Sequence, residues 1–297
     1  MRFDIKKTTH SAINSAILIL KLVIPLYILS DILLYMGWLD KFSFIFEPVT
    51  AILHLPANAA LSIAAGVTLN IYAAIALAAP LGLTPYEWTV LGLFLGVCHS
   101  MVVESVIMKK IGIPYIYSIF LRGSIGFIAV LPLSYFPKSW FSHDIVTKNI
   151  ETKNFDNFWQ MLYHSSINSL SLSFKIILLI VSIIFLMDFI KSSKVMQTYM
   201  QKVSTVFSIT AGLILGITYG AGVLINEAKS GSLTKRDIFF IATFLMICHS
   251  VIEDTLLFVI FGANYGILVT IRAILAIVVS FTFSKIVFGY IIPAFKR

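Results

Sequence analysis

The chain has 297 residues, of which 59% are hydrophobic and 12% are charged, and its formal net charge is +8. A soluble domain carries about 25% charged residues, so this composition excludes a water-soluble globular protein. No basic run is interleaved with aromatic residues, so nucleic acid is not expected as a partner. Both cysteines, Cys98 and Cys248, lie inside apolar segments, which argues against a disulfide framework.

Apolar segments long enough to cross a bilayer follow one another along the chain. About 20 apolar residues cross the hydrocarbon core, and the segments of this kind are 13–36, 114–135, 173–190, 238–260 and 267–292. The polar N-terminus is not followed by a small-residue cleavage site, so we do not expect a cleaved signal peptide. The sequence therefore predicts an all-α integral membrane protein whose solvent is the lipid bilayer.

The chain repeats itself with a period of 150 residues. Cys98-His99-Ser100 recurs as Cys248-His249-Ser250. Further residues recur in the same ungapped register: Gly66 and Thr68 as Gly216 and Thr218, Leu83-Thr84 as Leu233-Thr234, Phe94-Leu95 as Phe244-Leu245, Gly112 as Gly262, Tyr115 as Tyr265, Arg122 as Arg272, Glu87 as Asp237 and Glu104 as Asp254. This self-similarity predicts two copies of one unit, residues 1–136 and 158–297, joined by an extracytoplasmic connector over 137–157.

Loop charges indicate how the two copies lie in the membrane, because cytoplasmic loops collect Lys and Arg. In copy one the third loop carries Lys109 and Lys110. In copy two the first loop carries Lys191, Lys194 and Lys202, and the third loop carries no charge. Corresponding loops therefore belong on opposite sides, which makes the copies inverted. The same charge distribution predicts a multi-pass protein of the cytoplasmic (inner) membrane with both termini in the cytoplasm.

The second apolar segment of each copy, 57–79 and 206–226, is flanked by loops of the same charge character. Such a segment enters and leaves on one side, as a re-entrant helical hairpin turning at 66–70 and at 216–220. The predicted fold is thus two inverted repeats, each with three transmembrane helices plus one re-entrant hairpin. The alternative is eight full spans in parallel repeats, which places the basic loop 109–110 outside. Inverted repeats with interrupted helices are typical of secondary transporters with midplane substrate sites.

Three runs in copy one also look familiar: Gly-Val-Thr-Leu-Asn-Ile-Tyr-Ala-Ala-Ile-Ala-Leu at 66–77, Leu-Gly-Leu-Thr at 81–84, and Cys-His-Ser-Met-Val-Val-Glu at 98–104. In them the chain resembles the Gate, or nucleoside-recognition, membrane family. That family's fold is similar to the core of concentrative nucleoside transporters, bacterial ferrous-iron transporter B and the spore maturation membrane proteins. The resemblance covers essentially the whole chain and implies a permease-like core. The chain has no Gly-x4-Gly-Lys-Ser/Thr phosphate loop, so transport is expected to be passive, ion-coupled or dependent on another protein.

The repeated Cys-His-Ser motifs are the first candidates for a substrate or ion site, because an inverted two-fold axis brings them toward one central region. Their residues are Cys98, His99, Ser100, Cys248, His249 and Ser250. The two Cys and two His are candidate ligands for a borderline-soft metal such as Zn²⁺ or Fe²⁺, although their spacing matches no standard zinc pattern. The alternative is interhelical packing by small and hydrogen-bonding residues.

Charges inside the spans need partners, because an ionised group in hydrocarbon is costly. The expected pairs between adjacent spans are Glu104–Arg122 and Asp254–Arg272. The alternative leaves both arginines partly free to bind an anionic or phosphate-bearing solute through their planar forks.

Further candidates for the substrate site lie at the inferred hairpin turns: Thr68, Asn70, Thr218 and Tyr219. Broken helices there would expose backbone groups, and half-helix N-termini favour anions; the alternative is a flexible glycine in an ordinary span. Glu253, matched to Val103 in copy one, follows His249 by one helical turn. It breaks the symmetry, as a directional coupling site would.

These features predict a permease that moves a small polar solute, nucleoside-like or anionic, by alternating access at a midplane site. One alternative is a transporter of divalent metal ions (Fe²⁺ or Zn²⁺), and another is a non-transporting membrane scaffold or accessory subunit. No nucleophile–base arrangement is evident, so neither an enzyme nor a cofactor is expected, apart from a coupling ion. The expected partners are the bilayer and the solute, and the formation of a homo-oligomer is left as an open alternative.

Overall fold

The chain is helical throughout the parts that the structure describes. The computed structural model describes residues 3–38, 47–141, 155–193, 208–210, 212–213 and 233–288, and no strand occurs in these ranges. In chain order the helices are α1 (Ile5–Tyr35), α3 (Glu47–Ile52), η2 (Ala57–Ala59), α4 (Ala60–Thr68), α5 (Ile71–Ala78), η3 (Ala79–Leu81), α6 (Pro85–Cys98), α7 (Met101–Lys110), α8 (Tyr115–Val130), η4 (Leu131–Tyr135), η5 (Lys138–Phe141), α9 (Phe158–Ser192), α13 (Lys235–Ile247), α14 (Glu253–Val259) and α15 (Tyr265–Ile286).

Within the described ranges, five helical segments are long and apolar enough to cross a membrane: α1, α6 with α7, α8 with η4, α9 and α15. The predicted segments 13–36, 114–135, 173–190 and 267–292 overlap α1, α8 with η4, α9 and α15, and residues 289–292 lie outside the described residues. The chain is therefore a multi-pass, all-α membrane protein, as its composition predicts.

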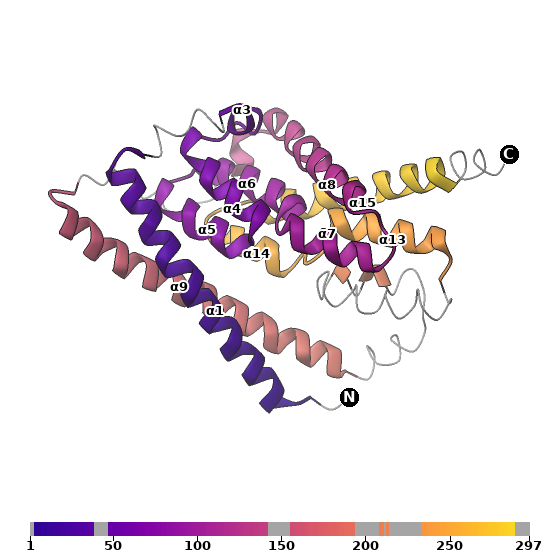
Figure 1. Ribbon diagram of the computed structural model, residues 1–297, viewed down its shortest axis with the longest axis horizontal. Helices are drawn as coiled ribbons and strands as arrows, with labels where there is room; N and C mark the ends of the chain where they lie inside the picture. Colours follow the sequence, from indigo (N-terminus) through magenta and orange to yellow (C-terminus); the bar gives the residue numbers. More distant parts are fainter. Residues whose placement is uncertain are drawn as a thin grey trace.

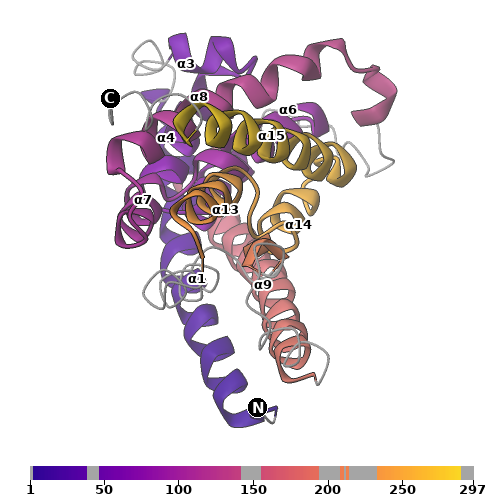
Figure 2. The ribbon, with the colours of Figure 1, turned by 90° about the vertical axis from the view of Figure 1, so that its right-hand side faces the viewer.

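The two longest helices, α1 and α9, lie side by side and project together from the rest of the molecule (Figures 1 and 2). Thr8, near the start of α1, donates a hydrogen bond to Asp188, near the end of α9, with an oxygen–oxygen distance of 2.8 Å. At the opposite end, the rings of Tyr35 and Phe158 meet edge to face with centroids 6.1 Å apart. The two helices are therefore antiparallel.

Segment 57–79 forms the predicted helical hairpin. Its arms, α4 and α5, have 9 and 8 residues, or roughly 12–14 Å at 1.5 Å per residue, less than half of the hydrocarbon core. Ser62 donates to the carbonyl of Ala74 at 2.8 Å across the two arms. The turn falls at Leu69-Asn70, where the Asn70 side chain accepts from Ala73 N and caps α5.

The Cys-His-Ser segments break their helices, which the hydropathy pattern did not predict. The chain is extended at His99 and left-handed at Ser100 (φ 45°), so α6 ends and α7 begins there. Ser250 takes the same conformation (φ 46°) in the gap between α13 and α14. The expectation of a continuous span over 238–260 is therefore wrong.

Carbonyl groups from distant segments compensate for the hydrogen bonds lost at each break. Ser100 N–H donates to Gly66 O at 2.9 Å, and Val251 N–H donates to Leu213 O at 3.0 Å. The breaks therefore depend on partners that lie far away in the sequence. The sequence around each break stays as apolar as that of a continuous helix. No Pro or Gly marks either break, so local sequence rules predict an uninterrupted helix.

The hairpin α4–α5 and the described residues 208–210 and 212–213 correspond in a different register from the rest of the sequence repeat. A Cβ on Gly66 would approach Leu95 Cδ2 to 2.6 Å, and a Cβ on Gly212 would approach Leu245 Cδ2 to 2.5 Å. Gly212, and not Gly216 as the ungapped register predicts, thus takes the place of Gly66. Ser62-Ile63-Ala64-Ala65-Gly66 and Ser208-Ile209-Thr210-Ala211-Gly212 show the same correspondence. The second predicted turn, 216–220 with Thr218 and Tyr219, lies outside the described residues.

Gly126→Ala is expected to destabilise the protein by about 1–3 kcal/mol, because the added Cβ would run into Cys98 Sγ, where α8 packs on α6. Gly123→Ala on the same helix is the matched control, since its Cβ would meet nothing within 4 Å. Thermal unfolding in detergent measures both variants, and adding Cys98→Ala to Gly126→Ala should restore part of the stability. Equal stability of the two glycine variants would contradict this close approach.

Candidate functional site

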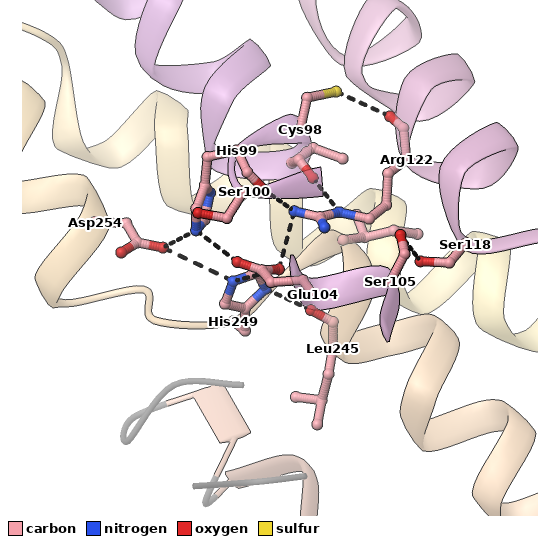
Figure 3. Close-up of polar contacts among 12 residues, drawn as sticks. Cys98, His99, Ser100, Glu104, Ser105, Ser118, Arg122, Leu245, His249 and Asp254 are labelled. Atoms are coloured by element: carbon pink, nitrogen blue, oxygen red, sulfur yellow. Dashed lines mark hydrogen bonds and ion pairs between the residues drawn. The ribbon is translucent and has the colours of Figure 1, made fainter. Parts of the chain in front are cut away.

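The two helix breaks bring His99 and His249 together, as the inverted arrangement of the motifs predicts. Their ring centroids are 5.2 Å apart, and both residues are buried, with 7% and 1% of their surface exposed. Each imidazole sits where a helix has ended, so its direction is set by the extended chain and not by a helical face. Figure 3 shows the two rings pointing into a common space from different halves of the chain.

Two buried carboxylates complete the group around the imidazoles (Figure 3). His99 Nε2 lies 3.0 Å from Glu104 Oε1 and 3.7 Å from Asp254 Oδ2. His249 Nε2 lies 3.5 Å from Glu104 Oε2 and 4.0 Å from Asp254 Oδ2. Each carboxylate therefore faces both imidazoles, and we name these four residues the central cluster.

Backbone contacts determine which ring nitrogens face the carboxylates. His99 Nδ1 lies 2.8 Å from Leu95 O, and His249 Nδ1 lies 2.7 Å from Leu245 O. A carbonyl oxygen only accepts hydrogen bonds, so each Nδ1 carries the proton, and a neutral ring then has its lone pair on Nε2. Two lone pairs facing two carboxylates repel one another unless a cation lies between them. The central cluster is thus built to hold a cation, either a metal ion or protons on Nε2.

Polar atoms in the central cluster also lack hydrogen-bond partners. His249 Nε2 and Asp254 Oδ2 are buried and accept or donate no hydrogen bond within the described part of the chain. A buried polar atom without a partner costs about 1–3 kcal/mol. A cation bound by these atoms would remove that cost.

The donor set and its spacing fit a divalent transition metal. Imidazole nitrogen and carboxylate oxygen are both common Zn²⁺ ligands, and in a tetrahedral site with bonds of about 2.0–2.1 Å neighbouring ligand atoms lie roughly 3.3 Å apart. The four nitrogen–oxygen distances of 3.0–4.0 Å lie on both sides of that value. Ligand atoms of His99, Glu104 and His249 also fall within 4.8 Å of one another. The Nδ1–H···O=C bonds match the second hydrogen bond that metal-bound histidines usually make.

Both arginines support the helix breaks. Arg122 donates from Nε to Val97 O at 2.7 Å and from Nη2 to His99 O at 2.6 Å. Arg272 donates from Nε to Ile247 O at 3.2 Å and from Nη2 to His249 O at 2.7 Å. These carbonyls end α6 and α13, where a helix leaves acceptors unpaired. Each arginine thus holds the carbonyl of a cluster histidine in place.

One of the two expected ion pairs is present. Arg122 Nη2 lies 3.0 Å from Glu104 Oε2, which confirms that pair. Asp254 and Arg272 form no ion pair within 4.0 Å in the described structure, so that expectation is wrong. The physical reason is length: aspartate is one methylene shorter than glutamate, and Asp254 Oδ2 is directed toward the imidazoles.

The other predicted site residues lie around the central cluster without joining it. Cys98 Sγ donates to Arg122 O at 3.1 Å, and Cys248 is a completely buried free thiol. The metal-ligand group found among the described residues contains neither thiol. Ser100 Oγ donates to Leu69 O at 3.0 Å, whereas Thr68 Oγ1 bonds back to its own helix at Ala64 O.

Tyr72 is a neighbour of the site that the sequence reading missed. Its hydroxyl lies 3.0 Å from Glu253 Oε1 and joins the first hairpin to the second half of the chain. A tyrosine in an apolar run gives no local signal of such a contact. Only the position of Glu253, an extra acid beside Asp254, pointed to this place.

Comparison with known proteins supports the membrane assignment. The chain is 26% identical over 274 residues to the uncharacterized membrane protein YvoD of Bacillus subtilis (strain 168). The aligned region covers 88% of this chain and 87% of that protein. No family model matches the chain, and no solved structure matches it.

Proposed function

We propose that the chain is a membrane permease that carries a divalent transition-metal ion through a site between its two halves. The observation that carries this proposal is the convergence of two imidazole nitrogens and two carboxylates on one buried point. Buried ionisable groups in membrane proteins commonly mark an ion pathway. The metal ion is the cargo, and His99, Glu104, His249 and Asp254 are its ligands.

Inverted repeats are the architecture that we propose for this permease. Corresponding helices α1 and α9 run antiparallel. Trp88, near the start of α6, stacks on Phe261 in the α14–α15 turn with ring centroids 4.3 Å apart. Tyr117, near the start of α8, lies 5.3 Å from Phe239 near the start of α13. In eight parallel spans the members of each pair would lie on opposite sides of the membrane, so both contacts favour inversion.

The charges support an orientation with both termini in the cytoplasm. The helix ends that share one side gather basic residues, namely Lys6, Lys7, Lys109, Lys110, Lys191, Lys235 and Arg236. The other side carries Glu47, Glu87 and Lys138. By the positive-inside rule the basic side faces the cytoplasm, and the hairpin α4–α5 enters from outside. Lys194, Lys202 and residues 142–154 of the connector lie outside the described residues.

Alternating access would take place around the central cluster, at the boundary of the units 1–136 and 158–297. Transporter sites of this kind lie where discontinuous helices meet near the midplane. The breaks at Ser100 and Ser250 supply such helix ends. The resemblance to Gate-like permease cores also supports alternating access. The name of the uncharacterized relative indicates no substrate.

An anionic or nucleoside-like solute stays a prediction with less support. Arg122 and Arg272 are almost completely buried and are engaged with helix-ending carbonyls. Arg122 Nη1 has no hydrogen-bond partner among the described residues, but binding a solute through a whole fork would break the other contacts. The cation therefore fits the central cluster better than an anion does.

Elemental analysis of the purified protein tests the proposal. We expect about one metal ion per chain after loading with Zn²⁺ or Fe²⁺, and a loss of affinity greater than about 100-fold in His99→Ala and in His249→Ala, since even outer ligand partners cost 10–100-fold. Cys98→Ala and Cys248→Ala are matched controls, because both thiols lie outside the cluster, and they should retain the metal.

Other outcomes separate the alternatives. Substoichiometric metal in the wild-type protein, with no difference in the histidine variants, would end the metal proposal. Thermal stabilisation by a nucleoside or phosphate instead would favour the organic or anionic solute. No stabilisation by any solute, together with tight co-purification of another protein, would favour the scaffold.

A further inference from the structure

One hydrogen bond ties the first hairpin to the second half of the chain. Tyr72 Oη donates to Glu253 Oε1 at 3.0 Å. Tyr72 lies on α5, two residues after the turn at Asn70, and Glu253 is the first residue of α14. The next residue, Asp254, belongs to the central cluster, so the bond lies directly beside the proposed metal site.

The tip of this hairpin lies against the helix break that carries His99. Ser100 contributes two hydrogen bonds there, from its N–H to Gly66 O at 2.9 Å and from its hydroxyl to Leu69 O at 3.0 Å. The hairpin is attached to the first half at Ser100 and to the second half at Tyr72. Movement of the tip away from α14 would break the Tyr72 bond and uncover the region beside Asp254.

The sequence does not repeat this pair of residues in the other copy. The position that corresponds to Glu253 is Val103, whose side chain has no polar atom and is 57% exposed. In the hairpin register set by Gly66 and Gly212, Tyr72 corresponds to Thr218, which is too short to replace a tyrosine. The sequence therefore supplies the residues for this bond in one copy only, so the two copies are not equivalent at this place.

We propose that the Tyr72–Glu253 bond is a latch that keeps the hairpin α4–α5 closed over the central cluster. The hairpin is the outer gate, and the residues at the corresponding positions, Thr218 and Val103, cannot form the same bond. The latch therefore favours the outward-closed conformation. The identity of the cation enclosed by the gate rests on the proposed function, whereas the latch is tested in the absence of any cation.

Cysteine labelling tests the latch in a chain whose natural thiols are replaced, Cys98→Ala with Cys248→Ala. Ile71→Cys is the reporter, because Ile71 opens α5 and is 4% exposed. Tyr72→Phe removes only the hydroxyl, and Glu253→Val introduces the residue type found at the corresponding position of the first half, Val103. In both variants an impermeant maleimide added outside should label the reporter about tenfold faster or more. This is the factor expected from the loss of a hydrogen bond to a carboxylate. Glu253→Gln keeps an acceptor oxygen and should label slowly, like the parent.

A second reporter distinguishes gate opening from general loosening. Ala276→Cys is fully buried on α15 and should stay unlabelled in every variant; faster labelling there as well would overturn the proposal. Unchanged labelling of Ile71→Cys in both Tyr72→Phe and Glu253→Val would also overturn it. A chain that binds no metal but shows the expected labelling would remove the metal proposal and leave the latch in place.

Discussion

Arg122→Gln is expected to destabilise the protein by about 3–5 kcal/mol, the usual cost of removing one member of a buried ion pair. Arg122 is fully buried, and its guanidinium serves three acceptors, Val97 O, His99 O and the Glu104 carboxylate. The substitution leaves two helix-ending carbonyls without a donor and a carboxylate without a counter-charge. Arg272→Gln should cost less, because Arg272 serves carbonyls and no carboxylate.

A double-mutant cycle separates the ion pair from the capping role. Removing Glu104 together with Arg122, as Glu104→Gln with Arg122→Gln, should cost less than the sum of the two single changes, by about 1–3 kcal/mol. The matched cycle, Asp254→Asn with Arg272→Gln, should show a clearly smaller coupling, because no ion pair joins these residues. Denaturant unfolding in micelles gives all the values. Equal couplings in the two cycles would contradict the structural asymmetry.

The sequence predicts much of the fold because its strongest signals are collective. Hydropathy over windows of about 20 residues locates α1, α8, α9 and α15. Equal loop charges on both sides of segment 57–79 predict a hairpin, and the structure has one. These properties depend on composition over a segment, so a few exceptional residues do not obscure them.

The parts that the sequence did not predict depend on distant contacts or on single methylenes. Helices end at Cys98 and Ile247 because distant carbonyls and buried guanidinium groups form hydrogen bonds with the free backbone groups. An ungapped register treats Glu104 and Asp254 as equivalent, yet only the longer side chain reaches its arginine. The shorter one lies beside the imidazoles, with its Oδ2 3.7 Å from His99 Nε2 and 4.0 Å from His249 Nε2.

Cysteine labelling on intact cells should separate the inverted arrangement from eight parallel spans completely. In the inverted arrangement Lys138→Cys lies outside and Lys110→Cys lies in the cytoplasm; parallel spans exchange the two positions. Both lysines are exposed, so access to the thiols is limited only by the membrane. An impermeant reagent added outside should label Lys138→Cys and not Lys110→Cys, and lysed cells should label both.

The same experiment at the loops of copy one and copy two tests whether corresponding loops lie on opposite sides. Position 41 should react from outside and position 194 should not, although both lie outside the described residues. Reaction of Lys110→Cys from outside would return the parallel arrangement and would leave the stacking of Trp88 on Phe261 without an explanation. Protection of Lys110→Cys together with labelling of Lys138→Cys requires an odd number of crossings between the α7–α8 turn and η5, which α8 supplies. Tyr86, at the start of α6, packs on Phe141 of η5 with ring centroids 5.0 Å apart, so the start of α6 would then lie outside and the end of α7 inside. The break at Ser100 would lie within the membrane, and so would the proposed metal ligands.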